Sequence, residues 1–379
     1  MNHSCRRVYF YCRDNVDAYQ DDVVVLAEGL RQLGAQVFGN CNYWRTSLAP
    51  DSWLVRYDPS VRHQDCDIVA VSYVWSRWAD MDFRVHSTPL PEDLFAPGRR
   101  YRTAFLDLDD GYFSSGFHPA YRSFDAVFRA KHNRRCFHPA NHRPWALGLS
   151  QRMLDCTADV RPWPDRQKDL LINFNASHPY IHPARVTMEA HFTPVAARHY
   201  AINRELDDLK VAPADPLDRL MWQQTQHRHS RSYYERLCRS QAVAAFCGEL
   251  IPPAPFAPPY LVGGGRARLL RAFYDALGHV DPRPPRLVQW DSWRFWEGLA
   301  AGCLVFNFDL PYYGVQLPVM PENFAHYVGV RPDNAAEVLA RLEREPGLAE
   351  RIASQGRAWA LEHYSPAAMA RRFLDTLAA

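Results

Sequence analysis

The stretch Gln289-Trp290-Asp291-Ser292-Trp293-Arg294-Phe295-Trp296-Glu297-Gly298-Leu299-Ala300-Ala301-Gly302-Cys303-Leu304-Val305 decides how the second half of this chain folds. We expect an amphipathic helix over 290–301, a glycine stop at Gly302 and a strand over 304–308. The small residues Ala300, Ala301 and Gly302 would let the end of the helix pack closely on the sheet that this strand enters. A helix that runs directly into such a strand is typical of an α/β fold.

The beginning of this helix carries side chains that suit a diphosphate. Asp291 or Ser292 can cap the helix N-terminus, where free N–H groups and the positive end of the dipole attract anions. Arg294 and Glu297 are three residues apart and therefore share one helix face. Arginine can bind phosphate oxygens, and a carboxylate can accept hydrogen bonds from ribose hydroxyls. The alternative is an ordinary amphipathic helix on which Arg294 and Glu297 form a solvated ion pair.

Strands and helices alternate on both sides of this stretch. A β-prone run over 8–12, a helical pattern over 23–33 behind two aspartates, and a run over 35–38 predict a βαβ unit and a parallel sheet. Further strands are expected over 67–73, 102–108, 124–129, 169–174 and 242–247, and further helices over 183–191, 233–238, 266–277, 335–344 and 346–363. This alternation predicts doubly wound sheets, whose sites lie at the carboxyl ends of the strands.

The length of the chain predicts two domains. Its 379 residues exceed one ordinary domain and fit two of about 150 to 200 residues. The stretch 150–168 holds Pro162 and Pro164 and has no clear period, so it resembles a linker. We therefore expect one Rossmann-like domain over 1–150 and a second over 169–365.

The composition argues against several classes of protein. A net charge of +2 leaves no basic surplus for nucleic-acid binding. The nine cysteines are irregularly spaced without a CxxC motif, which predicts reduced thiols and a cytoplasmic protein. No apolar run approaches the roughly 18 residues of a membrane helix, and residues 1–14 lack a signal-peptide core, so any membrane association would be peripheral. The sixteen histidines lack the spacing of a zinc site, so we expect no bound metal.

The residues from Glu297 to Val305 resemble the nucleotide-sugar motif in the C-terminal domain of GT-B glycosyltransferases of the family 1 and family 4 type. In that motif a glutamate is followed by a run of small residues, a glycine and a strand. Residues 351–357, 362–365 and 366–377 are similar to the end of such chains, where the last helix often crosses back to the N-terminal domain. The resemblance extends over about 287–377.

This resemblance implies two Rossmann-like domains that face each other across a cleft. It implies transfer of a sugar from a nucleotide-sugar donor to an acceptor hydroxyl on a surface polysaccharide, a lipid-linked sugar or a protein, with no cofactor and no metal requirement. Glu297 would bind the donor ribose, and the helix N-terminus near Ser292 would face the diphosphate. A non-catalytic module that binds a nucleotide sugar or a glycan, and a nucleotide-sugar epimerase, are the alternatives on the same fold.

The stereochemistry of the transfer stays open at this stage. Retaining members of the family often carry two glutamates eight positions apart. The position eight residues before Glu297 is Gln289, which is not acidic. The sequence therefore favours neither retention nor inversion.

Candidate catalytic residues follow a predicted strand of the first domain. Asp107, Asp109 and Asp110 precede Gly111 where the strand over 102–108 ends. An inverting transferase needs a general base beside the acceptor hydroxyl, and a carboxylate in the cleft can supply it. Asp110 is the first candidate, Asp109 the second and His118 a third. The alternative is a turn in which the aspartates cap the chain.

Candidate donor contacts also follow the strands of the second domain. Asn175 and His178 lie in the loop after the strand over 169–174, and Arg185 lies further on, as a second phosphate ligand. Asp309 and Tyr313 follow the strand over 304–308, where they could bind sugar hydroxyls. An ordinary surface loop or strand-to-loop turn is the alternative in each case.

Overall fold

The computed structural model describes residues 6–13, 19–75, 89–108, 119–174, 182–206, 211–251 and 283–378. Several expectations fall outside these ranges: the candidates Asp109, Asp110, His118, Asn175 and His178, and the helix expected over 266–277.

The first half of the chain forms a six-stranded sheet in which all neighbouring strands are parallel. The strand order is β2-β1-β5-β6-β7-β8. Its strands are β1 (Arg7–Tyr11), β2 (Gln36–Gly39), β5 (Ile68–Ser72), β6 (Arg102–Asp107), β7 (Ala126–Arg129) and β8 (His142–Pro144). Strands β5 and β7 are buried along their whole length, as expected when helices or loops cover both faces of a parallel sheet. A short hairpin, β3 (Tyr43–Arg45) and β4 (Trp53–Val55), follows β2.

The second half forms a five-stranded parallel sheet in the order β10-β9-β11-β14-β15. Its strands are β9 (Gln167–Leu171), β10 (Ala201–Asn203), β11 (Ser240–Ala244), β14 (Leu304–Phe308) and β15 (Val328–Val330). The helices of this half are α3 (Pro183–His191), α4 (Thr193–Ala196), α5 (Pro216–Gln224), α6 (Arg231–Arg239), α8 (Trp293–Ala300), α9 (Ala335–Arg344) and α10 (Leu348–Tyr364). A separate antiparallel pair joins β12 (Glu249–Ile251) to β13 (Arg286–Val288).

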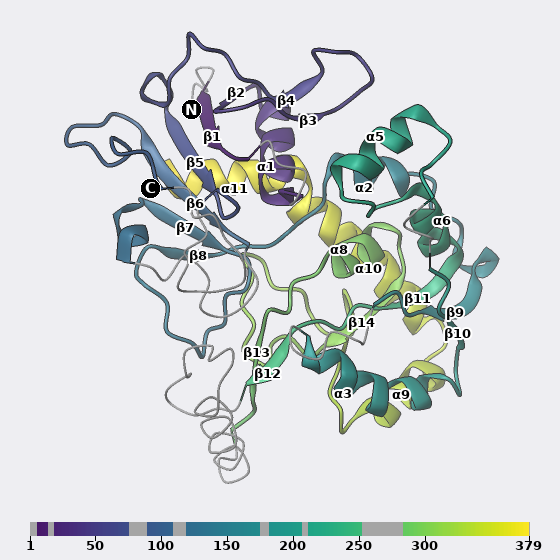
Figure 1. Ribbon diagram of the computed structural model, residues 1–379. Helices are drawn as coiled ribbons and strands as arrows, with labels where there is room; N and C mark the ends of the chain where they lie inside the picture. The colour runs from purple at the N-terminus through teal and green to yellow at the C-terminus, as the bar shows by residue number, and fades with distance from the viewer. Residues whose placement is uncertain are drawn as a thin grey trace, which may run out of the picture.

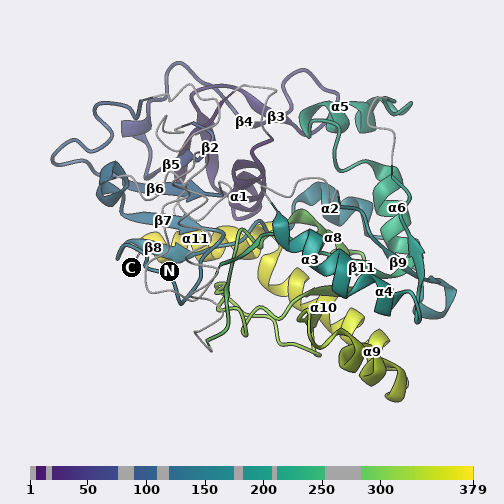
Figure 2. The ribbon, with the colours of Figure 1, turned by 60° about the horizontal axis from the view of Figure 1, so that its bottom comes forward.

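The last helix, α11 (Pro366–Ala378), returns to the first half of the chain and packs on α1 (Asp21–Gln32). Figures 1 and 2 show α11 in yellow beside α1 and under the first sheet. The contact is close because Gly29 has no side chain: a Cβ there would lie 1.8 Å from the carbonyl oxygen of Pro366. Phe373 of α11 also packs against Phe128 of β7 with the rings tilted and their centroids 5.0 Å apart.

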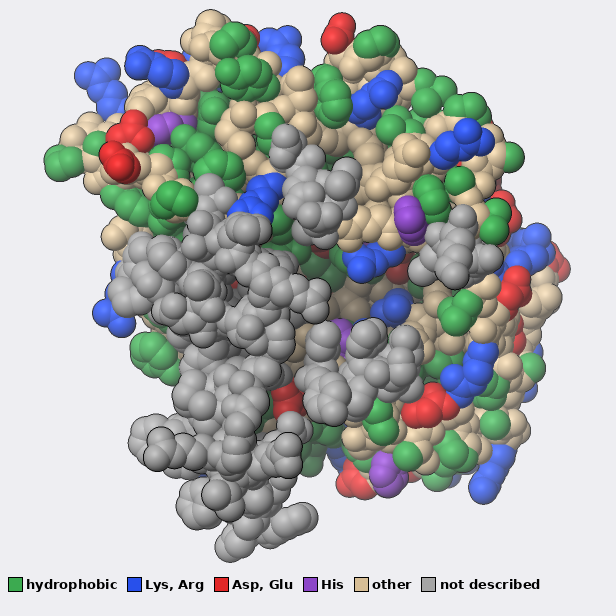
Figure 3. Space-filling model, viewed as in Figure 1, with side chains coloured by type: hydrophobic (Ala, Val, Ile, Leu, Met, Phe, Trp, Pro, Cys, Tyr) green, Lys and Arg blue, Asp and Glu red, His purple; other side chains and the backbone are tan. Residues whose placement is uncertain are grey.

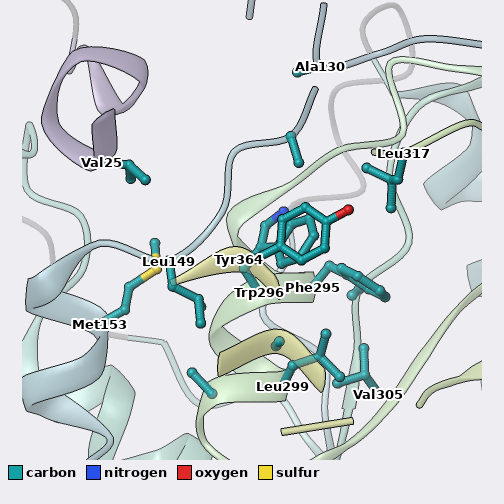
Figure 4. Packing of buried hydrophobic residues seen from close by; sticks show 14 of the residues in the cluster. Val25, Ala130, Leu149, Met153, Phe295, Trp296, Leu299, Val305, Leu317 and Tyr364 are labelled. Carbon is teal, nitrogen blue, oxygen red and sulfur yellow. The ribbon is translucent and has the colours of Figure 1, made fainter. Parts of the chain in front are cut away.

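Helix α8 is embedded in the core of the second half. Trp296 is fully buried, and its ring centroid lies 4.5 Å from that of Tyr364. Figure 4 shows these two side chains lying against each other. Gly298 permits close packing on the sheet, because a Cβ there would lie 2.5 Å from Val243 Cγ1 of β11. The guanidinium of Arg166 donates to the carbonyls of Gly302 at 2.7 Å and Ala301 at 3.0 Å, which places a cation at the negative end of the helix dipole.

The structure corrects two expectations about local structure. Helix α8 begins at Trp293 rather than at 290, because Gln289 has a left-handed φ of 54° and Ser292 is extended (φ −144°, ψ 146°). Ser292 is thus the N-cap residue, as one of the two expected capping positions. The expected linker contains helix α2 (Gln151–Cys156), whose N-cap Ser150 accepts a hydrogen bond from Met153 N at 3.3 Å.

Short 3₁₀ turns occur at His63–Asp65, Pro119–Ser123 and Trp163–Asp165. None of the helices in the described ranges is long and apolar enough to cross a membrane.

Candidate functional site

A cleft of about 600 Å³ lies where the carboxyl ends of the two sheets face each other. From the first half it is lined by residues that follow strands or begin a helix: Tyr19, Asp21, Tyr73, Leu108, Lys131 and Leu147. From the second half it is lined by Asn173, His182, Arg185, Leu206, 226–230, Tyr233, Cys247, 291–294 and Glu297. Figure 3 shows the hollow between the two halves, with Lys and Arg side chains inside it. This is the position at which doubly wound folds bind their ligands.

Two aspartates form hydrogen bonds that join the start of helix α8 to the first half of the chain at this cleft. Asp291 accepts from Leu147 N at 2.8 Å through Oδ2 and from Trp296 Nε1 at 2.7 Å through Oδ1. Asp21, at the start of α1, accepts from Trp293 Nε1 at 2.6 Å. Burial raises the pKa of Asp291 to about 7 and that of Asp21 to about 6. Both oxygens of Asp291 are therefore engaged within the protein.

The N-terminus of α8 opens into the cleft with an unpartnered hydroxyl. Ser292 is the N-cap residue, yet its side chain accepts no hydrogen bond from the helix. Its Oγ is buried without a hydrogen-bond partner among the described residues. A buried hydroxyl without a partner costs free energy, so a ligand atom that bonds it would recover that cost. The free N–H groups of the first turn add a positive potential at the same place.

Cationic side chains from both halves surround this N-terminus. Arg294 donates from Nε to Asn173 O, and its terminal nitrogens have no hydrogen-bond partner in the described part of the chain. Arg185, on α3, is buried and donates to Phe246 O and Cys247 Sγ, both at 3.3 Å. Lys131 follows β7 and donates to Leu108 O at 3.4 Å, and Arg228 stacks on Trp293. The cleft therefore contains four cationic side chains that can attract an anionic ligand.

Glu297 lines the cleft, but protein donors occupy most of its carboxylate. His229 Nδ1 lies 2.6 Å from Oε1, Tyr234 OH donates to the same oxygen at 3.1 Å, and Tyr233 OH donates to Oε2 at 3.2 Å. Arg294 and Glu297 share the cleft without forming an ion pair. The solvated pair considered for them is therefore absent.

A strained turn between α5 and α6 forms one side of the cleft. Gln226, His227 and His229 have φ values of 55°, 66° and 54°, which is unusual for residues other than glycine. Such strain persists where the surrounding structure enforces it, and it is concentrated at functional sites. His227 stacks on Trp222 with centroids 3.7 Å apart, and the Gln224 amide exchanges hydrogen bonds with the Arg45 backbone of the first half.

The structure does not bring every predicted residue to the cleft. Asp309 accepts from Tyr312 N at 3.3 Å, Tyr313 packs edge-on against Phe308, and neither lines the cleft. Asp107 forms a buried ion pair of 2.6 Å with Arg129 NH1. Sequence reasoning missed Asp21, Lys131, Arg228 and His229. Among these, Lys131 carried a usable signal, because it follows a predicted strand.

Comparisons with known proteins agree with this architecture. No protein-family model matches the chain, and no curated protein matches it. The chain is similar to a solved alpha-glucosyltransferase in complex with UDP and a 13-mer DNA containing an HMU base, with 11% identity, a TM-score of 0.53, and 99% of this chain and 100% of that chain covered. It is also similar to AviGT4, a glycosyltransferase involved in avilamycin A biosynthesis, with 14% identity, a TM-score of 0.50, and 98% and 97% covered.

At these identities the similarity establishes the fold alone. The two parallel sheets, the cleft at their carboxyl ends and the returning helix α11 define the GT-B architecture of two Rossmann-like domains. The fold class expected from the sequence is confirmed.

Proposed function

We propose that this protein transfers a sugar from a nucleotide-sugar donor to an acceptor hydroxyl. The observation that carries the proposal is the N-terminus of α8, where the unpartnered Ser292 Oγ and the guanidinium of Arg294 face the cleft. A diphosphate satisfies the hydroxyl, the free N–H groups and the cation together. The UDP in the similar alpha-glucosyltransferase structures supports this type of donor.

The geometry supports a different role for each half of the chain: the second half binds the donor and the first half binds the acceptor. The second half holds the donor diphosphate, while Arg185 and Lys131 add positive charge that stabilises the departing diphosphate. This charge is why we propose catalysis without a bound metal ion. The acceptor lies against the first sheet, and Asp110, Asp109 and His118 remain our candidates for a base that takes its proton. A closed cleft excludes water, which favours transfer over hydrolysis.

For the acceptor we propose only its chemical class, and for the protein a cellular compartment. A surface polysaccharide, a lipid-linked sugar and a protein all offer a suitable hydroxyl. The net charge of +2 supports an acceptor other than nucleic acid, although one similar enzyme was solved with DNA. The nine cysteines are irregularly spaced and form no CxxC motif, which supports a reducing compartment, the cytoplasm, with any contact to a membrane being peripheral.

Calorimetry on a ladder of ligands tests the diphosphate site. The ladder consists of the nucleoside, monophosphate and diphosphate of uridine, guanosine and adenosine. For one of the three bases, we expect the affinity to rise with each added phosphate. Arg294→Ala should remove most of the affinity that the diphosphate adds. Arg344→Ala, on the exposed part of α9, is the matched control and should change nothing. If added phosphates increased the affinity for none of the three bases, this result would contradict the proposal.

A further inference from the structure

The carboxylate of Glu297 already accepts more hydrogen bonds from the protein than a direct ligand of both ribose hydroxyls could accept. Glu297 is 2% exposed. Oε1 receives His229 Nδ1 and Tyr234 OH, and Oε2 receives Tyr233 OH. A carboxylate accepts about four hydrogen bonds, so roughly one position remains for a ligand. A ribose diol presents two hydroxyl groups, which this single position cannot serve.

His229 transmits the effect of this carboxylate toward the cleft. The 2.6 Å contact with an acceptor-only carboxylate means that Nδ1 carries a proton and donates it. The other ring nitrogen, Nε2, is buried and has no hydrogen-bond partner among the residues that the structure describes. Nε2 accepts a hydrogen bond if the ring is neutral and donates one if it is charged. A hydroxyl group can complement both states, because it both donates and accepts.

The surroundings of His229 place its ring beside the N-terminus of α8 in the cleft. Its ring contacts Trp293, the first residue of α8, edge-on with centroids 4.8 Å apart, and Tyr19 of the first half at 5.5 Å. Its backbone has a left-handed φ of 54°, a conformation that costs free energy. The ring therefore contacts the first residue of α8, at the helix N-terminus where we propose that the diphosphate binds. His229 belongs to the second half of the chain.

We propose that His229 Nε2 binds a ribose hydroxyl of the donor nucleotide, and that Glu297 acts through His229 as a positioning residue. This inference rests on the proposed function. The transferred sugar has to face the acceptor at the first sheet, so the nucleoside extends along the second half. His229, Glu297, Tyr233 and Tyr234 all belong to that half. Their hydrogen bonds fix the imidazole orientation before the nucleotide arrives.

The test combines a ligand change with a side-chain change in the full-length protein. The probes are UDP, GDP and ADP, each with its 2′-deoxy and 3′-deoxy analogue, and the readout is affinity by calorimetry. His229→Asn is the decisive variant, because an asparagine amide can replace Nδ1 toward Glu297 but has no atom at Nε2. Asparagine also tolerates the left-handed backbone found here. His227→Asn is the matched control, since His227 also lines the cleft with a left-handed φ.

The expected result is a loss of discrimination rather than a general loss of binding. Wild type should bind its preferred diphosphate about 3- to 10-fold more tightly than at least one deoxy analogue, as one hydrogen bond provides. His229→Asn should reduce this ratio to less than about 2-fold, and His227→Asn should preserve it. An unchanged ratio in His229→Asn, or no discrimination in wild type, would overturn the inference while leaving the proposed function intact. If wild type binds no nucleotide, the proposed function fails, and this inference fails with it.

The positioning role of Glu297 has its own spectroscopic test. A free histidine side chain favours the proton on Nε2, so a proton held on Nδ1 of His229 is a signature of the carboxylate. We expect the ¹⁵N shifts of His229, assigned by difference from His229→Asn, to show a protonated Nδ1 in wild type. In Glu297→Leu, which leaves no acceptor opposite Nδ1, the Nδ1 signal should move toward that of an unprotonated nitrogen, and the ribose discrimination should shrink. An unchanged imidazole spectrum in a folded Glu297→Leu variant would contradict the positioning role.

Discussion

Trp293 Nε1 donates a hydrogen bond of 2.6 Å to Asp21 Oδ2, joining the first turn of α8 to the first turn of α1 across the cleft. Asp21 is 3% exposed, so its carboxyl depends on this partner. Trp293→Phe should lower the free energy of unfolding by about 1–3 kcal/mol, because the buried carboxyl loses its indole donor. Denaturant titration measures the change. In the double variant with Asp21→Asn the two effects should not add, and strict additivity would show that the bond contributes nothing.

Ser292→Ala should separate stability from ligand binding. Replacing an N-cap serine usually costs about 0.5–2 kcal/mol. Here the Oγ makes no capping bond and is buried without a partner in the described structure, so the free energy of unfolding should stay within about 0.5 kcal/mol of wild type. The affinity for a nucleoside diphosphate should nevertheless fall about 3- to 10-fold. Equal losses for the diphosphate and for its nucleoside would show that this hydroxyl does not contact phosphate.

Gly298→Ala should displace α8 and weaken the site indirectly. The added methyl would lie 2.5 Å from Val243 Cγ1 and 3.0 Å from Val305 Cγ2. Overpacking of this kind costs about 1–3 kcal/mol, and a shift of the helix should also reduce nucleotide affinity. Val243→Ala provides the space, so the double variant should recover part of both losses. No recovery would place the origin of the effect elsewhere.

Stability should fall as the pH rises, because buried carboxyls take up protons in the folded state. Burial and the neighbouring Asp21 raise the pKa of Asp22 from 3.8 to about 8. Between these values the folded protein binds a proton that the unfolded chain has released. The free energy of unfolding therefore decreases with pH over that window, by at most about 1.4 kcal/mol per unit for each such group. Denaturation at pH 5 and pH 8 should show a smaller difference in Asp22→Asn than in wild type.

The candidate base is tested by three amide variants. Asp110→Asn keeps the shape of the side chain and removes its basicity. If Asp110 deprotonates the acceptor, kcat should fall by about 10²–10⁴-fold with donor affinity nearly unchanged. Asp109→Asn and His118→Asn test the other two candidates by the same steady-state assay. Near wild-type turnover in all three variants would exclude Asp109, Asp110 and His118 as the base.

The parts of the fold that could be predicted are those whose signal is local. The strand over 304–308 and the helix over 183–191 have the expected bounds, because apolar runs and flanking proline or glycine specify them within a few residues. The start of α8 was misplaced because Gln289 adopts a left-handed conformation without being a glycine. That conformation is imposed by neighbouring structure, which no local pattern records.

The hydrogen bonds of the candidate site depend on long-range contacts. Arg294 and Glu297 were recognised from their spacing, but their partners are Asn173 O and His229 Nδ1, which are distant in the sequence. His229 is one of sixteen histidines without the spacing of a zinc site, and no local pattern distinguishes it from the others. Its position beside Glu297 follows from the packing of α6 against α8, and sequence spacing cannot supply that.

The most direct test of sugar transfer is incubation of the full-length protein with a panel of nucleotide sugars, followed by mass spectrometry of the products. We expect slow hydrolysis of one donor to its nucleoside diphosphate and free sugar, and its suppression in Arg294→Ala. Binding without turnover would indicate a non-catalytic module, and isomerisation of the donor would indicate an epimerase. Either result would contradict a glycosyltransferase.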